Sequence, residues 1–273
     1  MSNERVIAKK QFGQNFLKDQ SILRKIIESM PDTPHRIAEI GPGLGDLTKY
    51  LVDVKSVVAF EVDTDLCKHL NKKFADEIAT ARLTIRCGDV LEGWKSELVD
   101  EPYDLVANLP YYIATNIILK ALADPQCKNL LVMIQREVAQ KFSAEPGEKA
   151  FGALSVIAQS VGTASIVIDV PPSAFTPPPK VDSAVLLIEK AADRSDTLFE
   201  TMLKAAFAQP RKTLLKNLSS RYDKGNLQEA FECLELAPSV RPHQVSVSDY
   251  HQLYNILERR SLDGRGNTTT SDK

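Results

Sequence analysis

The stretch RIAEIGPGLGD, residues 36–46, decides the fold of this chain. Its first five residues are mostly apolar and too few to form an amphipathic helix, which is typical of an interior strand. Three glycines follow at positions 41, 43 and 45, and a helical pattern begins near Asp46. Glycine allows a ligand to approach the backbone closely. A strand, a glycine-rich turn and a helix in this order predict a ligand site at the carboxyl end of a central strand.

Around this stretch, from residue 36 to residue 190, short apolar runs alternate with helical patterns. Short, uniformly apolar strands are typical of a mostly parallel sheet that helices cover on both faces. We therefore expect an α/β domain of the Rossmann-like, doubly wound type with seven strands. The predicted strands are Arg36–Ile40, Ser56–Glu61, Leu83–Arg86, Tyr103–Ala107, Leu130–Ile134, Ser165–Val170 and Ala184–Glu189. Crossover helices are predicted at Asp46–Val52 and Asp65–Ala75.

Beyond Lys190 the strand patterns cease, and a small all-α domain is predicted. Pro210 should end its first helix, because proline cannot continue one. The prolines at 171–172 and 177–179 exclude a helix there and predict a stiff loop. We expect a domain over residues 1–190, a helical domain over 191–261 and a disordered, Gly/Thr/Asn/Ser-rich tail over 262–273. The helices are predicted at Thr197–Ala208, Thr213–Tyr222, Leu227–Leu234 and Ser248–Arg259.

The overall composition limits the classes to which this protein can belong. The chain has 273 residues, is 43% hydrophobic and carries a net charge of −2, so it can bury a full core and is not a polycation. Residues 1–11 are polar and basic, unlike a signal peptide. No run approaches the ~20 apolar residues that span a bilayer. We expect a cytoplasmic monomer that does not contact a membrane.

The cysteines and histidines give no metal-ligand spacing. No C-x-x-C pair is present, and no histidine lies at ligand spacing from a cysteine. We therefore expect small buried or free thiols in a reducing compartment and predict no metal site. The cysteines in question are Cys67, Cys87, Cys127 and Cys233.

Two carboxylates follow the glycine-rich turn at informative places. Glu61 ends the second predicted strand, 20 residues after Gly41, where an acid can accept hydrogen bonds from ribose hydroxyls. Asp89 follows the third strand, within reach of an adenine ring across the strand ends. A dinucleotide motif needs a third glycine where Asp46 stands, and a carboxylate there disfavours pyrophosphate. The pattern favours S-adenosylmethionine as the cofactor, and an NAD(P) oxidoreductase is the weaker alternative.

The segment Asn108-Leu109-Pro110-Tyr111 follows the fourth predicted strand and reaches the same edge of the sheet. The amino nitrogen of adenine is a poor nucleophile, because its lone pair is delocalised into the ring. Two acceptors directed at its N–H groups, the Asn108 side-chain oxygen and the Leu109 carbonyl, would free that pair and support the developing charge. Tyr111 can stack on the base. An Asn-x-Pro turn after a strand is common by itself, but beside the cofactor signals it predicts an adenine-directed methyltransferase.

Five motifs in this order resemble the ribosomal RNA adenine N6,N6-dimethyltransferase family, specifically its bacterial branch. The resemblance runs from about Lys9 to Leu218, most of the chain. The motifs are KQFGQNFL (10–17), EIGPG (39–43), NLPY (108–111), QREVA (135–139) and FTPPPKVDS (175–183). The resemblance implies a Rossmann-like S-adenosylmethionine-dependent methyltransferase domain, with a seven-stranded, mostly parallel sheet, followed by the small helical domain.

The resemblance also implies roles for individual residues. Asn15 and Leu17 would contact S-adenosylmethionine by closing the N-terminal segment over it. Phe175, held by the proline-rich loop, would sandwich the flipped adenine with Tyr111. The remaining cofactor contacts would come from Gly41, Gly43, Glu61, Asp89 and Asn108.

The implied substrate is a pair of adjacent adenosines in the 3′-terminal hairpin of small-subunit (16S) ribosomal RNA, within a 30S precursor. Residues 204–221 hold five basic residues and no acidic one, which fits phosphate contacts. The predicted RNA-binding residues are Lys10, Arg211, Lys212 and Lys216. Two departures from the family pattern, Pro210 and Ala153, each stand where an arginine is frequent, which leaves RNA affinity and docking open.

Two further alternatives remain open from the sequence. A large-subunit rRNA methyltransferase of the antibiotic-resistance type shares the fold and chemistry, although the NLPY and FTPPPKVDS segments argue against it. A mainly non-catalytic ribosome assembly factor is the other, and Glu61, Asp89, Asn108 and Tyr111 favour catalysis instead.

Overall fold

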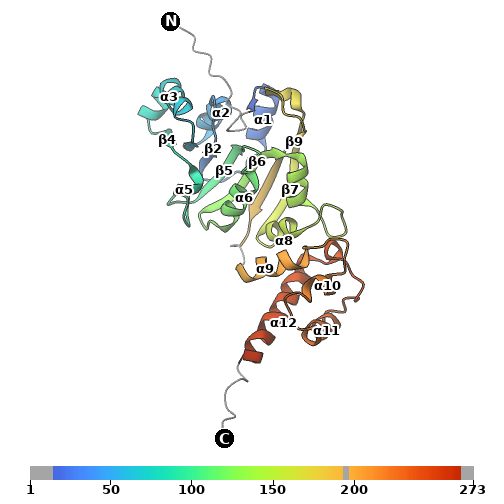
Figure 1. Cartoon of the computed structure of the whole chain (residues 1–273). Helices are drawn as coiled ribbons and strands as arrows, with labels where there is room; N and C mark the ends of the chain where they lie inside the picture. Colours follow the sequence, from blue (N-terminus) through green and yellow to red (C-terminus); the bar gives the residue numbers. More distant parts are fainter. Residues whose placement is uncertain (1–14, 193–196, 266–273) are drawn as a thin grey trace. The chain divides into compact units, whose positions relative to one another are not determined.

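The computed structural model describes residues 15–192 and 197–265, with side chains through residue 258. Its main feature is a seven-stranded sheet of order β4-β3-β2-β5-β6-β9-β7 (Figure 1). The pairs from β4 to β6 are parallel, and β9 runs antiparallel to both β6 and β7. The strands are β2 (Arg36–Ile40), β3 (Val57–Glu61), β4 (Leu83–Cys87), β5 (Tyr103–Asn108), β6 (Cys127–Gln135), β7 (Gly162–Val170) and β9 (Ser183–Lys190).

This sheet confirms the predicted fold class and all seven predicted strands. The central strands are short and apolar because both of their faces are buried, and every residue of β3 is buried. The largest boundary errors are in β6 and β7, each of which begins three residues before its prediction. Their extra residues include polar side chains, so apolar runs alone did not indicate them.

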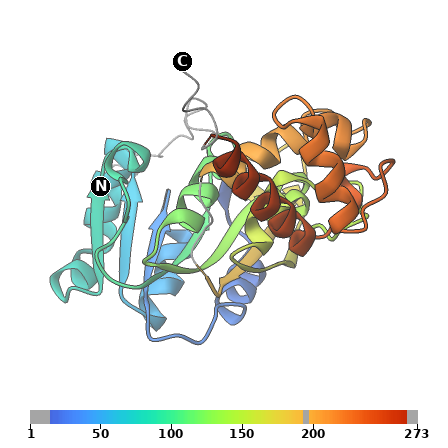
Figure 2. The same ribbon diagram turned by 90° about the horizontal axis from the view of Figure 1, so that it is seen from below.

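Helices cover the sheet on both faces, as a doubly wound fold requires (Figures 1 and 2). The predicted crossover helices form as α2 (Asp46–Val54) and α3 (Thr64–Lys73), and α2 packs against β3. The chain leaves the helical conformation at Phe74 before the next helix begins. Sequence periodicity did not single out α1 (Gln20–Glu28), α4 (Ala75–Ala79), α5 (Val90–Gly93), α6 (Ala114–Ala123), α7 (Arg136–Ser143) and α8 (Ala153–Gln159).

A second, two-stranded sheet joins distant parts of the chain. β1 (Phe16–Leu17) pairs antiparallel with β8 (Phe175–Thr176), with Leu17 opposite Phe175. The proline-rich loop leading to β8 is not wholly free of helix, because η2 (Pro172–Ala174) is a single 3-10 turn. The expectation that prolines exclude helix here was wrong at Pro172, since proline's fixed φ and missing N–H suit the first position of a helix. The Thr176–Pro177 peptide bond is cis.

The described residues form two compact units. The first comprises residues 15–140 and 161–192 and contains both sheets. The second comprises residues 141–160 and the helices that follow residue 196. Those helices are α9 (Thr197–Ala206), α10 (Leu214–Leu218), α11 (Lys224–Cys233), η3 (Pro242–Gln244) and α12 (Val247–Arg265).

The second unit differs from the predicted helical domain in the residues that it includes and in where its last helix ends. Residues 141–160, predicted to belong to the first domain, pack with the later helices: the Ser160 hydroxyl lies 2.8 Å from Nε2 of His251, whose ring stacks on Phe199. Residues 262–265, predicted to begin a disordered tail, extend α12, because an established helix propagates readily. The rest of that tail lies outside the described residues.

Candidate active site

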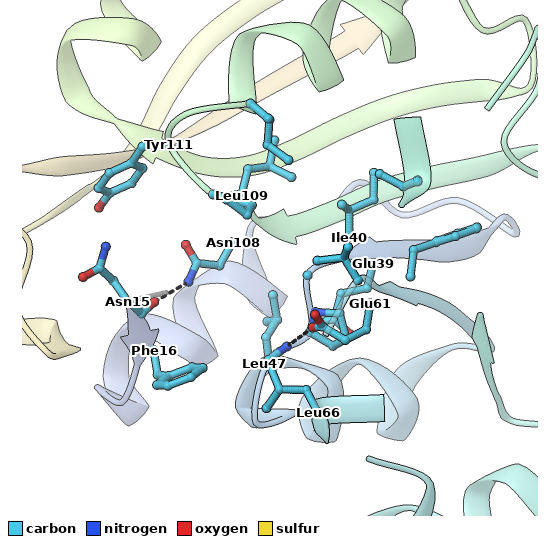
Figure 3. Close-up of a pocket in the computed structure, with 18 of the residues that line it drawn as sticks. Asn15, Phe16, Glu39, Ile40, Leu47, Glu61, Leu66, Asn108, Leu109 and Tyr111 are labelled. Atoms are coloured by element: carbon cyan, nitrogen blue, oxygen red, sulfur yellow. Dashed lines mark hydrogen bonds between the residues drawn. The ribbon is translucent and has the colours of Figure 1, made fainter. Parts of the chain in front are cut away.

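One cavity opens at the carboxyl ends of β2, β3 and β5 in the first unit (Figure 3). The space between its lining atoms is about 1130 Å³, including its solvent-open mouth. The lining contains most of the residues that the sequence predicted for the cofactor and the base: Asn15, Leu17, Gly41, Gly43, Glu61, Asp89, Asn108, Leu109 and Tyr111. The fold therefore brings together residues that are up to 96 positions apart, from Asn15 to Tyr111.

The glycine-rich turn contributes Gly41 and Gly43 to the cavity lining and has a backbone that only glycine adopts readily. Gly43 and Gly45 have φ values of +60° and +74°. A Cβ at Gly45 would lie 2.4 Å from the Phe74 ring, so a side chain is excluded there. The Lys73 ammonium donates to the Leu44 carbonyl at 2.7 Å and holds the turn in place.

Glu61 is fixed by its own surroundings. Its carboxylate accepts from the backbone N–H of Gly43 at 3.1 Å and of Asp63 at 2.9 Å, and the residue is only 4% exposed. Burial raises the pKa of this carboxyl above its ordinary value, although the two backbone hydrogen bonds oppose the shift. A carboxylate with both oxygens anchored this way presents its remaining lone pairs in a fixed direction, as a diol-binding acceptor requires.

Glu39 is a site residue that the sequence analysis did not single out. It lies on β2 just before the glycine-rich turn, lines the cavity and is 1% exposed. Its carboxyl accepts from the Thr48 hydroxyl at 2.7 Å. Burial raises the pKa of Glu39 to about 8, and the negative charge of Glu61 adds to the shift. A charged residue inside an apolar strand was the available signal, because such a residue needs a special partner.

Asp89 has a structural role and also lies at the cavity. Its side chain caps α5 by accepting from the Leu91 N–H at 2.8 Å, which is the ordinary structural role of a loop acid. It also lines the cavity next to Gly88. The cofactor contact predicted for Asp89 stays a prediction.

Asn108 and Leu109 are held in place from both sides. The Asn108 side-chain amide donates to the Asn15 carbonyl at 3.1 Å, which turns the amide oxygen to the side of Tyr111 (Figure 3). The Leu109 N–H donates to the Met133 carbonyl of β6 at 3.1 Å. The N-terminal segment thus fixes which end of the Asn108 amide acts as acceptor.

Tyr111 is anchored on the far side of the cavity. Its hydroxyl lies 2.6 Å from the hydroxyl of Ser183, which is fully buried at the start of β9. Burial raises the pKa of the Tyr111 phenol, so the phenol stays neutral at physiological pH. Ser183 is paired on both sides, with Gln135 of β6 and Val170 of β7, which makes it a rigid anchor.

Phe175 is not placed with Tyr111 at the cavity. It is 3% exposed, belongs to the hydrophobic core with Leu17, and is absent from the cavity lining of the described residues. Its predicted stacking role therefore has no geometric support in this conformation and stays a prediction. What the proline-rich loop does provide is the strand that pairs with the N-terminal segment.

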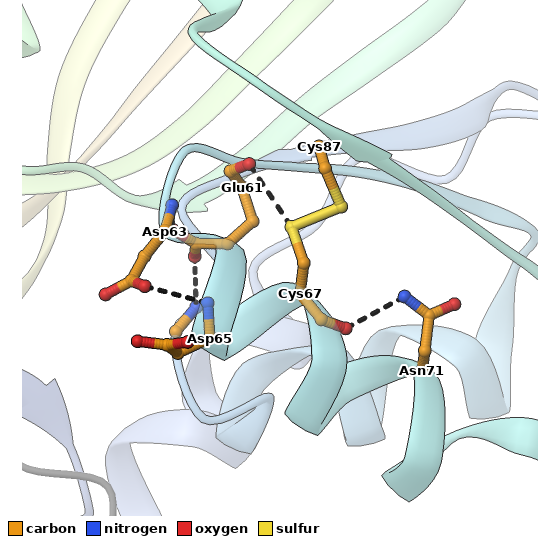
Figure 4. The surroundings of a disulfide bond; sticks show 7 residues. Glu61, Asp63, Asp65, Cys67, Asn71 and Cys87 are labelled. Carbon is orange, nitrogen blue, oxygen red and sulfur yellow. Dashed lines mark hydrogen bonds between the residues drawn. A yellow bond between two sulfur atoms is a disulfide. The ribbon is translucent and has the colours of Figure 1, made fainter.

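A disulfide joins Cys67 on α3 to Cys87 at the end of β4, beside Glu61 (Figure 4). The expectation of free thiols was wrong for this pair. Twenty residues separate the two cysteines in sequence, but the crossover helix folds back beside its strand and brings their Cα atoms to 6.2 Å. Cys127 is a buried free thiol and Cys233 an exposed one.

Three of the predicted RNA-binding residues lie in the second unit. Arg211, Lys212 and Lys216 are all exposed, in and just before α10. Lys10 lies outside the described residues. Within residues 15–192 and 197–258, no cluster of three His, Cys, Asp or Glu side chains could hold a metal ion. Among the described helices, none combines the length and apolarity that crossing a membrane requires.

Fold and cavity together define the class of this protein as a Rossmann-like methyltransferase. A dimethyladenosine transferase from Plasmodium falciparum has the same fold, with a TM-score of 0.76 at 22% identity over 90% of this chain and 98% of the other. The model of the family "Ribosomal RNA adenine dimethylase" matches residues 6–259. The chain therefore belongs to the ribosomal RNA adenine dimethylase family, which confirms the resemblance carried by its five motifs and the predicted class of enzyme.

Two curated relatives cover nearly the whole chain, and both carry the name "Ribosomal RNA small subunit methyltransferase A". The protein from Sulfurimonas denitrificans is 70% identical over 261 residues, which are 96% of this chain and 97% of the relative. The protein from Aliarcobacter butzleri is 52% identical, over 93% of this chain and 98% of the relative.

Proposed function

We propose that this protein transfers methyl groups from S-adenosylmethionine to the N6 atoms of two adjacent adenosines in the 3′-terminal hairpin of small-subunit ribosomal RNA. The observation that carries the proposal is the fixed Asn108 amide, whose oxygen faces the Tyr111 end of a cavity that also holds Glu61. The names of the two relatives support the small subunit as the source of the RNA.

The residues of the cavity fit the proposed cofactor. Gly41 and Gly43 of the glycine-rich turn line the cavity, and Glu61 offers anchored acceptors to a ribose. The Glu61 carboxylate brings a negative charge to the cavity lining, which suits a cation rather than a pyrophosphate. When bound, S-adenosylmethionine supplies an electrophilic methyl group on a sulfonium. The chain's residues hold it, align it and exclude water.

The end of the cavity lined by Asn108, Leu109 and Tyr111, here called the base end, prepares the adenine amine as the nucleophile. The Asn108 amide oxygen and the Leu109 carbonyl accept the two N–H groups of the adenine amine, which draws its lone pair out of conjugation with the ring. Because the Asn15 carbonyl holds the Asn108 amide nitrogen, the acceptor is oriented before the base arrives. Tyr111, anchored by Ser183, presents its ring to the base. No strong general base is needed, since the methylated amine loses its proton readily.

The two units divide the work in this proposal. The first unit binds cofactor and target base, and Arg211, Lys212 and Lys216 of the second unit contact RNA phosphates through their exposed charges. Reversing the charge of all three residues should weaken binding to 30S particles and reduce its salt dependence. If binding and its salt dependence are unchanged, these three residues do not contact RNA phosphates. The proposed setting is a cytoplasmic monomer acting on a 30S precursor.

Incubation of the protein with labelled S-adenosylmethionine and undermethylated 30S subunits tests the central claim. Nucleoside analysis should find N6,N6-dimethyladenosine in the small-subunit RNA. The same assay on separated 50S subunits tests the large-subunit alternative, and label there instead would select it. Asn108→Ala protein that binds 30S particles but leaves them unmethylated would separate catalysis from an assembly role. If no dimethyladenosine forms with the wild-type protein, the proposed function fails.

A further inference from the structure

Two consecutive tyrosines in the segment that follows β5 have different surroundings. The hydroxyl of Tyr111 is hydrogen-bonded to a buried serine, whereas Tyr112 is 62% exposed. Both residues line the cavity. Tyr112 is the one aromatic ring among the large hydrophobic side chains exposed in the described part of the chain, which are Val54, Val62, Tyr112, Val167, Val181 and Leu198.

The backbone around Tyr112 is held firmly although its ring is in solvent. The Ile113 N–H donates to the Pro110 carbonyl at 3.2 Å and closes the turn, and α6 begins at the next residue. Ile117 is fully buried on that helix and its N–H donates to the Ile113 carbonyl. Tyr112 therefore presents its ring from a fixed backbone, so that binding a ligand has to order only the two side-chain torsions of a tyrosine.

We propose that Tyr112 is a stacking platform for the base next to the target adenosine, a ligand site that rests on the proposed function. A base that enters the cavity leaves its neighbour in the strand without a stacking partner. The neighbour stays at the mouth because the backbone tethers it to the target. Of the aromatic side chains that line the cavity, Tyr112 is the most exposed. In the proposed substrate that neighbour is the second adenosine, so the site holds one target while the other is methylated.

The chemistry of the surface favours a nucleotide base over a protein partner. A single ring with a polar hydroxyl matches the flat face of a base, and stacking of this kind tolerates any base. A protein interface would instead extend over a contiguous apolar patch. Of the other large hydrophobic side chains exposed in the described part, only Val62 also lines the cavity.

Four variants test the platform on undermethylated 30S subunits. Tyr112→Ala and Tyr112→Leu both remove the ring, and the leucine keeps an apolar side chain. Tyr112→Phe keeps the ring and loses the hydroxyl. Val54→Ala is the matched control, because Val54 is 51% exposed at the end of α2 and does not line the cavity.

We expect Tyr112→Ala and Tyr112→Leu to raise KM for the subunit by at least about fivefold, the lower end of what one stacked base contributes. Tyr112→Phe and Val54→Ala should stay within about twofold of the wild type. S-adenosylmethionine affinity, measured by calorimetry without RNA, should be unchanged in all four. A 2-aminopurine placed next to the target in a hairpin RNA should lose fluorescence on binding the wild type and Tyr112→Phe, but not Tyr112→Ala.

The outcomes separate this proposal from the one it rests on. Wild-type protein that forms no dimethyladenosine overturns the proposed function. If the wild type is active and Tyr112→Ala keeps its KM and its fluorescence change, the platform alone is overturned. If Tyr112→Leu keeps the wild-type KM, the contact is an apolar one with a protein. If Tyr112→Phe raises KM as much as Tyr112→Ala does, the contact is made by the hydroxyl. Either result overturns stacking.

Discussion

At the cofactor end of the cavity, Glu39 and Glu61 are held by groups that lie 2 to 18 residues away in the sequence. At the base end, Asn108 is held by a carbonyl 93 residues away and Tyr111 by a hydroxyl 72 residues away. The cofactor end therefore assembles with its own strand-turn-helix units. The base end is complete only when Asn15 and the start of β9 lie beside the segment that follows β5.

This difference predicts that variants at the two ends of the cavity lose different properties. A change at the cofactor end removes a charge or a close backbone approach and should affect cofactor affinity and local stability. A change at the base end should affect mainly the rate of methyl transfer. The following variants test that division, beginning with the largest expected effect.

Replacement of Asn108 by alanine removes the oriented acceptor and should lower kcat by about 10²-fold or more, the usual scale for one oriented group that stabilises a transition state. Melting temperature and 30S binding should change little. The measurement is single-turnover methyl transfer to undermethylated 30S subunits. Asn71→Ala is the matched control, because the Asn71 amide also donates to a backbone carbonyl but lies outside the cavity lining. Equal rates for the two variants would remove Asn108 from the chemistry.

Glu61→Gln should raise the dissociation constant for S-adenosylmethionine by roughly 10- to 100-fold, because charged hydrogen bonds are worth ~1.5–3 kcal/mol. Titration calorimetry without RNA measures this directly. Asp65→Asn removes the same charge from an exposed position on α3 and should bind like the wild type. A Glu61→Gln protein with undiminished affinity would contradict the ribose-binding role.

Glu39→Gln should change how stability depends on pH. Burial favours the neutral form of Glu39, whose pKa is raised from its ordinary 4.5 to about 8. Folding therefore becomes less favourable as pH rises through that interval, by on the order of 1.4 kcal/mol for each pKa unit of the shift. The glutamine has no proton to lose, and its amide oxygen still accepts from Thr48. Urea unfolding at pH 5.5 and pH 8 measures this. The free energy of unfolding of the variant, relative to that of the wild type, should be higher at pH 8 than at pH 5.5.

Loss of the Tyr111–Ser183 hydrogen bond should have the smallest effect of these changes on methyl transfer. Tyr111→Phe and Ser183→Ala should each lower methyl transfer by less than about tenfold, since a neutral hydrogen bond contributes ~1 kcal/mol. Because both variants remove the same bond, the double variant should be no worse than the more affected single one. Fully additive effects on kcat, with unchanged cofactor affinity, would mean that the bond does not position the ring.

The sequence determined the part of this protein that local chemistry specifies. Residues 36–46 predicted the strand, turn and helix, and strand ends placed Glu61, Asp89 and Asn108 at one edge, because parallel strands share a direction. Their residue types then favoured a nucleoside-like cation as the ligand and an amine as the target. The five motifs extended this to the family, which the whole-chain match confirms.

Only the tertiary structure decided which groups complete that edge. It joined Asn108 to Asn15 and Tyr111 to Ser183, buried Phe175 away from the cavity, and paired Cys67 with Cys87. It also grouped residues 141–160 with the second unit and left Tyr112 in solvent. The physical reason is the same in each case. A side chain's partner across 20 to 93 residues is fixed by packing of whole elements, which no local pattern encodes.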